Sequence, residues 1–111
     1  MANDPSVVQY LSVTIAATAG SILALADGGA VTMTGAMHSF VGTLETATVR
    51  ARGDGTAPTA TEGELVAIAA NVYLAESEIT KTQFIRTGAT SGVLKGHIYN
   101  VPLASVLGGA R

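Results

Sequence analysis

Residues 45–74 read ETATVRARGDGTAPTATEGELVAIAANVYL, and this stretch decides the fold. Residues 46–52 alternate small apolar with polar side chains, which is typical of a strand with one buried and one wet face. Residues 63–68 return as a second apolar run. Between them, the turn at 52–58 holds two glycines that allow positive φ, and Asp54 can hydrogen-bond its own turn. The pattern predicts a β-hairpin or a longer β-arch.

Alternating apolar and polar residues also predict strands on either side of this stretch. Residues 7–17 alternate clearly and predict a first strand, with Leu11, Val13 and Ile15 on one face. Residues 19–26 fit one or two helical turns or the end of a strand. Further strands are expected at 37–44, 72–74, 78–87 and 93–101, with turns at 27–29 and 88–92, whereas 31–35 is ambiguous.

About seven short strands separated by turns predict an all-β fold. We expect an antiparallel β-sandwich, jelly-roll-like, with at most one short helix. Phe84 and Ile85 are neighbours on one strand, so only one of them can face the core. The expected core residues are Val13, Ile15, Val49, Leu65, Ile68, Phe84, Ile85 and Ile98.

Length and composition favour one domain, residues 1–111, with apolar N- and C-terminal arms. Hydrophobic residues make up 48% of the chain and charged residues 13%, a balance that does not suit a disordered protein. The net charge of −2 gives no electrostatic attraction to nucleic acid, so no nucleic-acid partner is expected. Cysteine is absent, which removes disulfides and thiolate chemistry.

Two long segments, 5–26 and 28–44, contain no Asp, Glu, Lys or Arg. A run of that length raises the possibility of a membrane span or a secretory signal. Gln9, Ser12, Thr14 and Thr18 interrupt the first segment, and Asp4 gives its start the wrong charge for a signal. We therefore expect ordinary folded structure and no membrane partner.

The residues that could carry catalysis do not form a recognisable pattern. His38 and His97 lie on strands far apart in sequence, so we expect neither a metal site nor a cofactor. Glu62 with Glu64, and Glu76 with Glu78, could face one side of a strand, but solvated strand edges explain both pairs more simply. The nucleophile-elbow and phosphate-loop motifs are missing from the sequence. The prediction is a protein that is not an enzyme.

Arginines and the apolar tail are the candidate interface residues. Arg50 and Arg52 share one strand face, and Arg52-Gly53-Asp54 spells a tripeptide found in integrin ligands, although each residue also suits a turn. A solvated strand face and a protein interface explain the arginines equally well. An apolar tail should dock on its own sheet or on another subunit. The predicted interface residues are Arg50, Arg52, Arg86, Leu103, Val106 and Leu107.

The second half of the chain resembles a kind of small β-sandwich protein found in tailed-phage virions. The resemblance covers about residues 44–101 and is carried by five pieces, which are Val49-Arg50-Ala51-Arg52, residues 54–59, residues 62–65, Gln83-Phe84-Ile85-Arg86, and Gly92-Val93-Leu94 leading to Tyr99. In such proteins a strand that ends in arginine enters a glycine–proline turn, and a later strand carries a Phe-Ile-Arg-like core segment.

The resemblance implies a capsid decoration or cement protein that binds between capsomers, commonly as a homotrimer. Its partners would be copies of itself and the major capsid protein or another virion protein. The location would be the capsid surface, after synthesis in the host cytoplasm. A head–tail or tail-associated structural protein and a carbohydrate-binding module are the alternatives. For the second of these, the tyrosines at positions 10, 73 and 99 are the aromatic residues to consider.

Overall fold

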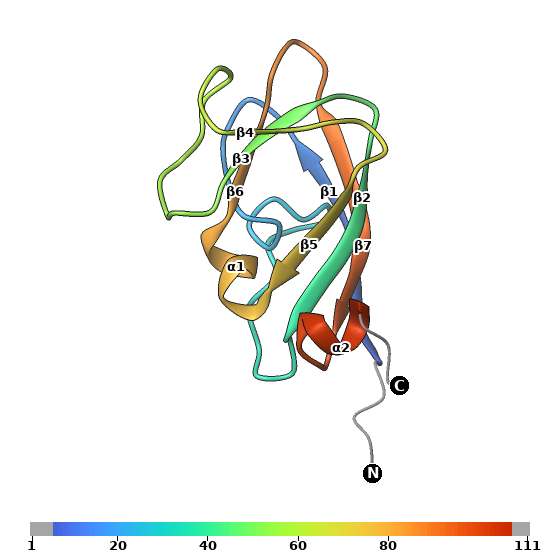
Figure 1. Cartoon of the computed structure of the whole chain (residues 1–111). Helices are drawn as coiled ribbons and strands as arrows, with labels where there is room; N and C mark the ends of the chain where they lie inside the picture. Colours follow the sequence, from blue (N-terminus) through green and yellow to red (C-terminus); the bar gives the residue numbers. More distant parts are fainter. Residues whose placement is uncertain (1–5, 108–111) are drawn as a thin grey trace.

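A computed structural model describes residues 6–107 and shows two antiparallel sheets packed face to face (Figure 1). One sheet has the strand order β1-β7-β2-β5 and the other the order β4-β3-β6. The predicted antiparallel β-sandwich is confirmed. The elements are β1 (Val7–Ile15), β2 (Ser39–Glu45), β3 (Val49–Arg52), β4 (Glu64–Val66), β5 (Asn71–Ala75), α1 (Glu76–Lys81), β6 (Gln83–Arg86), β7 (Gly92–Tyr99) and α2 (Leu103–Leu107).

The turn region within residues 45–74 forms a β-hairpin rather than a β-arch, because β3 and β4 lie in the same sheet. Val49 on β3 pairs with Val66 on β4, and the loop 53–63 joins the two strands. β3 begins only at Val49, later than predicted. Thr46 has a φ of 78°, which is outside the extended range, so the chain is still turning there.

The four-stranded sheet joins the two ends of the chain. β7 pairs with β1 on one side and with β2 on the other, so the last strand lies between the first two. The predicted alternation on β1 is confirmed, since Leu11, Val13 and Ile15 are buried. This sheet has one face against the core and one face toward solvent.

The predicted strand at 78–87 is wrong in its first half, where the chain forms α1. The Glu78 carboxylate accepts a hydrogen bond from the Ala75 N–H (2.7 Å), which satisfies a donor at the start of the helix. Ile79 is the buried residue of α1, and β6 starts two residues after the helix ends. With α2, the structure has two short helices, one more than expected.

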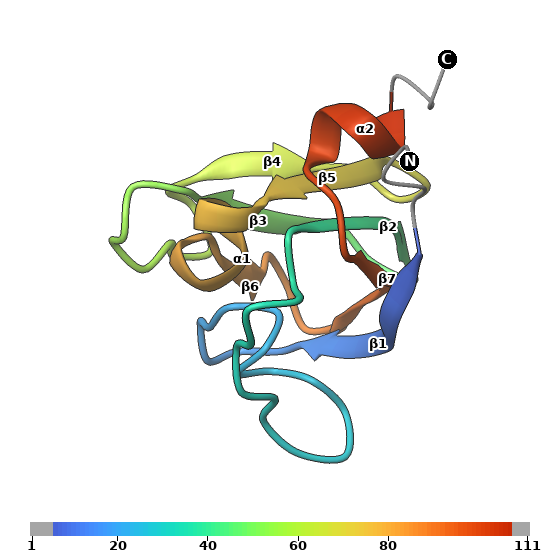
Figure 2. The same cartoon turned by 90° about the horizontal axis from the view of Figure 1, so that it is seen from below.

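The segment between β1 and β2 is neither of the two structures expected for it. Residues 22–25 form turns rather than a helix, and Ala26 makes an isolated bridge to Val13. The carboxylate of Asp27 holds the segment to β1 by accepting hydrogen bonds from the hydroxyls of Ser12 (2.9 Å) and Thr14 (2.8 Å). The Thr14 bond, followed by the Ser12 bond, lowers the pKa of Asp27 below its usual value. Figure 2 shows the segment looping out from the sandwich.

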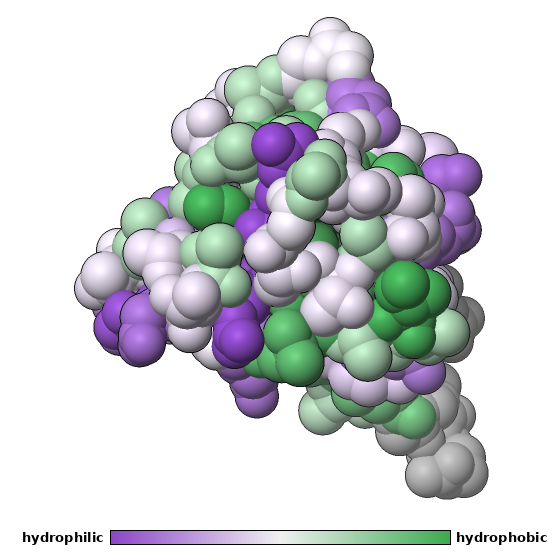
Figure 3. All heavy atoms as spheres, turned by 90° about the horizontal axis from the view of Figure 1, so that it is seen from above, coloured by the Kyte–Doolittle hydropathy of each residue, from purple (hydrophilic) through white to green (hydrophobic). Residues whose placement is uncertain are grey.

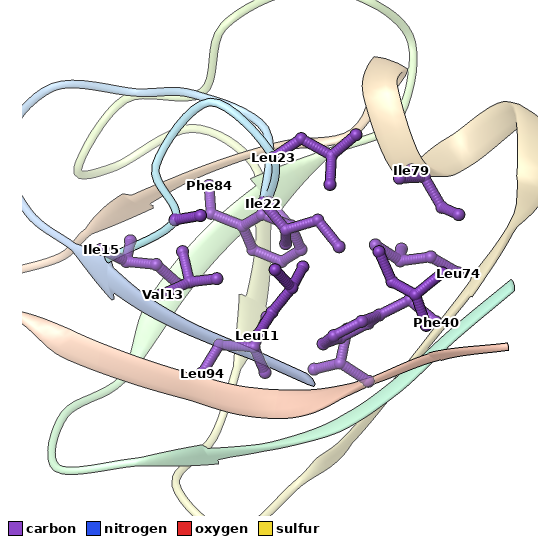
Figure 4. Packing of buried hydrophobic residues seen from close by; sticks show 14 of the residues in the cluster. Leu11, Val13, Ile15, Ile22, Leu23, Phe40, Leu74, Ile79, Phe84 and Leu94 are labelled. Carbon is purple, nitrogen blue, oxygen red and sulfur yellow. The ribbon is translucent and has the colours of Figure 1, made fainter. Parts of the chain in front are cut away.

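The core combines both sheets with side chains from the irregular segment. Ile22 and Leu23 of that segment point toward the strand residues and toward Ile79 of α1 (Figure 4). Of the expected core residues, Val13, Ile15, Val49, Phe84 and Ile98 are buried, and Ile85 is half-buried. Two predictions were wrong. Leu65 and Ile68 are 57% and 52% exposed. Leu65 pairs with Arg50 and so shares the outer face of the three-stranded sheet, and Ile68 lies on the connection between β4 and β5.

Candidate functional site

Arg50 and Arg52 lie on the solvent-facing side of the three-stranded sheet, as predicted from their spacing. Each is half-buried, and each guanidinium binds the loop 53–63. Arg50 donates through Nε to the Ala60 carbonyl (3.1 Å) and through Nη1 to the Gly63 carbonyl (2.9 Å). These bonds give Arg50 a structural task in fixing the hairpin loop.

Arg52 is engaged by the aspartate two residues later in the integrin-like tripeptide. Its Nη2 and Nε donate to the two carboxylate oxygens of Asp54 at 2.6 and 3.2 Å. This bidentate bond, together with the Thr56 N–H, lowers the pKa of Asp54 to about 2. The arginine and aspartate of the tripeptide are therefore bound to each other.

Arg86 does not share the surface of the other two arginines. It pairs in register with Val49, whereas the half-buried Ile85 pairs with Arg50. Alternate residues on a strand face opposite sides, so Arg86 lies on the other side of the sheet from Arg50 and Arg52. Its backbone N–H donates to the Ala16 carbonyl (3.0 Å). The three predicted interface arginines are not brought together.

The C-terminal apolar residues form α2, which contacts β5. The chain is attached just before the helix, where Val101 is buried and its carbonyl accepts a hydrogen bond from the Ser39 hydroxyl (2.9 Å). Leu103 and Val106 are half-buried, and Leu107 is 51% exposed. The tail contacts its own sheet through α2 but leaves Leu107 exposed, and residues 108–111 lie outside the described part of the chain, as do residues 1–5.

A pocket of about 620 Å³ lies between α2, α1 and the start of β2. His38 Nδ1 is 2.8 Å from Glu76 Oε1 at this pocket, and both side chains are partly exposed. Met33, Pro102 and Leu103 give it an apolar lining. The pocket joins one polar pair to an apolar wall at the end of the sandwich.

The carboxylate pairs expected on strands are not arranged that way. Glu76 and Glu78 are both in α1, where one pairs with His38 and the other accepts from the Ala75 N–H. Glu62 lies in the loop 53–63 and only Glu64 is on a strand. Within residues 6–107, no group of three or more His, Cys, Asp or Glu side chains could hold a metal ion.

A second hollow of about 530 Å³ runs between the edge strands β4 and β5. Leu65 and Tyr73 are among the exposed side chains at its walls, and Phe84 lies at its inner side. Ile68, also exposed, lies on the connection between the two strands. We call Leu65 and Ile68 the β4 rim. Figure 3 shows separate apolar patches among paler, more polar side chains on the upper end of the molecule.

No protein-family model, no curated protein and no solved structure matches the chain. Among the described residues, none of the helices has the length and apolar character needed to cross a membrane. The candidate site is therefore built from the geometry of this chain alone.

The sequence indicated three tyrosines as aromatic residues for a carbohydrate-binding module, but it did not show that they share one face. Tyr10, Tyr73 and Tyr99 all lie on the outer face of the four-stranded sheet, on β1, β5 and β7. One residue next to each tyrosine in sequence is apolar and buried, so strand alternation indicates that the tyrosine faces outward. What alternation alone could not supply was the strand order that brings three distant strands into one sheet.

Proposed function

We propose that this chain is a non-enzymatic structural protein of a tailed-phage virion, a decoration or cement protein that binds between capsomers. The alternative within the same class is a head–tail or tail-associated component. The proposal combines the resemblance over residues 44–101 with the distribution of apolar side chains. The resembling pieces fall on β3, the hairpin loop, β4, β6 and β7.

The observation that carries the proposal is the exposure of large apolar side chains at two elements, the β4 rim and α2. Leu65, Ile68 and Leu107 are each more than half exposed in a chain of only 111 residues. Large apolar side chains exposed at these two elements are candidates for contact with other proteins. A stable interface buries about 1,600 Å² in total.

A trimer is the form of self-association that we propose for these surfaces. A cyclic trimer uses two different surfaces of each copy, one donated to each neighbour. The β4 rim and α2 supply two candidates. Arg52 and the loop 53–63 would then lie beside the β4 rim, at the polar edge of the contact.

Light scattering of the purified chain at several concentrations, followed by co-sedimentation with shells of the phage that encodes it, tests the proposal. A variant ending at Pro102 retains the buried Val101 and its bond to Ser39, so its sheet should fold. We expect this variant to associate and to bind shells less than the full chain. A full-length chain that stays monomeric at high concentration and does not bind shells would remove the support for this function.

A further inference from the structure

The outer face of the four-stranded sheet carries a row of side chains that crosses all four strands. Tyr10 pairs in register with His97, His97 with Val41, and Val41 with Tyr73. Tyr99 lies two residues from His97 on the same face of β7. The ring centroids of Tyr10 and His97 are 5.4 Å apart, and those of His97 and Tyr99 are 6.3 Å apart. We call Tyr10, His97, Tyr99 and Tyr73 the ring face.

The outermost rings of the row are accessible to a ligand. Tyr10 is 53% exposed on the edge strand β1, and Tyr73 is 43% exposed on the edge strand β5. His97 and Tyr99 are half-buried between them. Three strand spacings separate the two outer tyrosines, a span of about 14 Å. The ring face is therefore an extended strip rather than a single point contact.

Charges around the ring face argue against an anionic ligand. Lys95 Nζ lies 3.5 Å from Glu45 Oε1 on the neighbouring row, and Asp27 lies against Ser12 and Thr14 at the β1 edge. One lysine and two carboxylates leave this surface slightly negative. Nucleic acids and acidic polymers would be repelled. A neutral ligand fits this charge balance.

Polar groups without charge flank the row. Thr43 and Asn71 lie on the adjacent row, with the Thr43 hydroxyl 3.5 Å from the Asn71 side-chain oxygen. Hydroxyl and amide groups can both donate and accept hydrogen bonds. Together with tyrosine rings, whose faces carry partial negative charge and attract C–H groups, they suit a ligand with alternating C–H faces and hydroxyl groups. Sugar rings have this chemistry.

The size of the face does not suit a second copy of the chain. Four strands about 4.8 Å apart and about 27 Å long give a face of roughly 500 Å². A standard protein interface needs about 800 Å² from each partner. An extended chain of sugars, which contacts a strip rather than a whole face, has no such requirement.

We propose that the ring face binds a neutral, unbranched polysaccharide, whose sugar rings stack on Tyr10, Tyr73 and the His97–Tyr99 pair. This activity goes beyond the proposed structural function and uses the outer face of the four-stranded sheet, whose edge at Tyr73 adjoins the β4 rim. A virion protein with this face would attach particles to glycans of a cell surface or its surroundings.

Tyrosine fluorescence provides a direct measurement, because the chain has no tryptophan and its only three tyrosines are on the ring face. The purified full chain is titrated with cellohexaose, maltohexaose and chitohexaose, and with hexagalacturonate as an anionic comparison. We expect saturable binding of at least one neutral hexasaccharide and weaker binding of hexagalacturonate. The absence of saturable binding by all three neutral probes overturns the proposal.

Variants then identify the surface. Tyr10→Ala and Tyr73→Ala should each weaken binding about tenfold, which corresponds to about 1.4 kcal/mol, whereas Tyr10→Phe keeps the ring and should bind nearly as well. Ile85→Ala, on β6 of the other sheet and away from both hollows, is the matched control and should bind like the unaltered chain. Circular dichroism confirms that each variant is folded.

Other results contradict the proposal and leave the structural function to its own test with shells. Unchanged sugar affinity in both alanine variants would place any binding elsewhere. Binding of a decaproline peptide at the ring face in place of the sugars would assign it to proline-rich partners. A change in molecular mass by light scattering in the tyrosine variants, without sugar binding, would make it a contact between copies.

Discussion

Gly42 on β2 and Gly96 on β7 lie directly opposite each other in the four-stranded sheet, under the ring of Phe40. A Cβ atom at Gly96 would collide with the Val41 carbonyl oxygen, and one at Gly42 would lie 2.6 Å from Cζ of Phe40. The buried ring therefore packs onto bare backbone. Glycine is required here because of space rather than because of positive φ.

Gly96→Ala should lower the free energy of unfolding by about 1–3 kcal/mol or more, because the methyl group meets backbone that cannot move aside cheaply. Urea denaturation measures the change. Gly88→Ala is the matched control, since nothing lies within 4 Å of a Cβ there, and its effect should be within about 0.5 kcal/mol. Equal effects of the two substitutions on stability would contradict the close approach of Gly96 to the backbone of β2.

Asp27→Ala should remove the side-chain contact between the turn at residue 27 and β1, and lower the free energy of unfolding at pH 7 by roughly 1 kcal/mol, since two hydrogen bonds at a mostly exposed site are lost. The segment stays in place through the Ala26–Val13 bridge and the buried side chains of Ile22 and Leu23. The folded pKa of Asp27 is below its unfolded value of 3.8, so its contribution is present at higher pH and is lost as the pH falls through the folded pKa. The difference between the chain and the variant should shrink below about pH 4. A difference independent of pH would refute the role of the ionised carboxylate.

Phe84→Ala should cost about 3–5 kcal/mol, because the side chain is 1% exposed and its removal leaves a cavity in the core. Ile85→Ala should cost about 1 kcal/mol or less, because that side chain is half-buried on the outer face. Thermal and urea unfolding of both variants provides the comparison. A larger loss of unfolding free energy for Ile85→Ala than for Phe84→Ala would mean that β6 presents its other face to the core.

The pKa of Asp54, followed by NMR of its carboxylate, should be about 2. In Arg52→Gln it should rise toward 3.8, because the bidentate bond supplies the largest part of the shift. The pKa of Asp54 is lower in the folded chain than in the unfolded chain. The stabilisation from its pairing with Arg52 is therefore fully present at neutral pH and is lost as the pH falls toward 2. Lys81→Gln is a suitable comparison, since Lys81 is not among the causes of the shift. An unchanged pKa of Asp54 in Arg52→Gln would contradict the pairing of Arg52 with Asp54.

Leu107→Asp should reduce self-association without destabilising the isolated fold, since Leu107 is exposed on α2. Light scattering at several concentrations gives the first result and urea denaturation the second. Thr43→Asp, exposed on the outer sheet face, is the control that adds the same charge elsewhere. Association that is equally weakened in both variants would point to charge rather than to the α2 surface.

Strand alternation was enough to find most of the sandwich. β1 and β7 were predicted with the correct inward residues because their apolar side chains recur at every second position. Residues 76–82 show why the same rule fails elsewhere. Ile79 fits a strand alternation with residues 81–85, but the Glu78 contact to the Ala75 N–H favours a helix start, and a single buried residue cannot distinguish the two periods.

Other features depended on strand order, which alternation does not contain. Leu65 lies in an apolar run typical of a core strand, yet it faces outward because its register partner on β3 is Arg50, on the outer face of the sheet. Ile22 and Leu23 enter the core from a segment without regular structure, so periodicity gave no signal for them. The arginines were placed correctly on their strands, but their hydrogen bonds to the loop 53–63 required the three-dimensional path of that loop.

The position of β7 between β1 and β2 has a consequence for synthesis of the chain. β1 and β2 have no hydrogen bonds to each other in this sheet, and Val7 finds its partner only at Tyr99. Contacts between such distant residues slow folding, toward milliseconds to seconds in all-β proteins. A growing chain on the ribosome would hold two incomplete edges until residues 92–99 have emerged. The four-stranded sheet would therefore close only after β7 has emerged, when the other strands of the described residues have already been made.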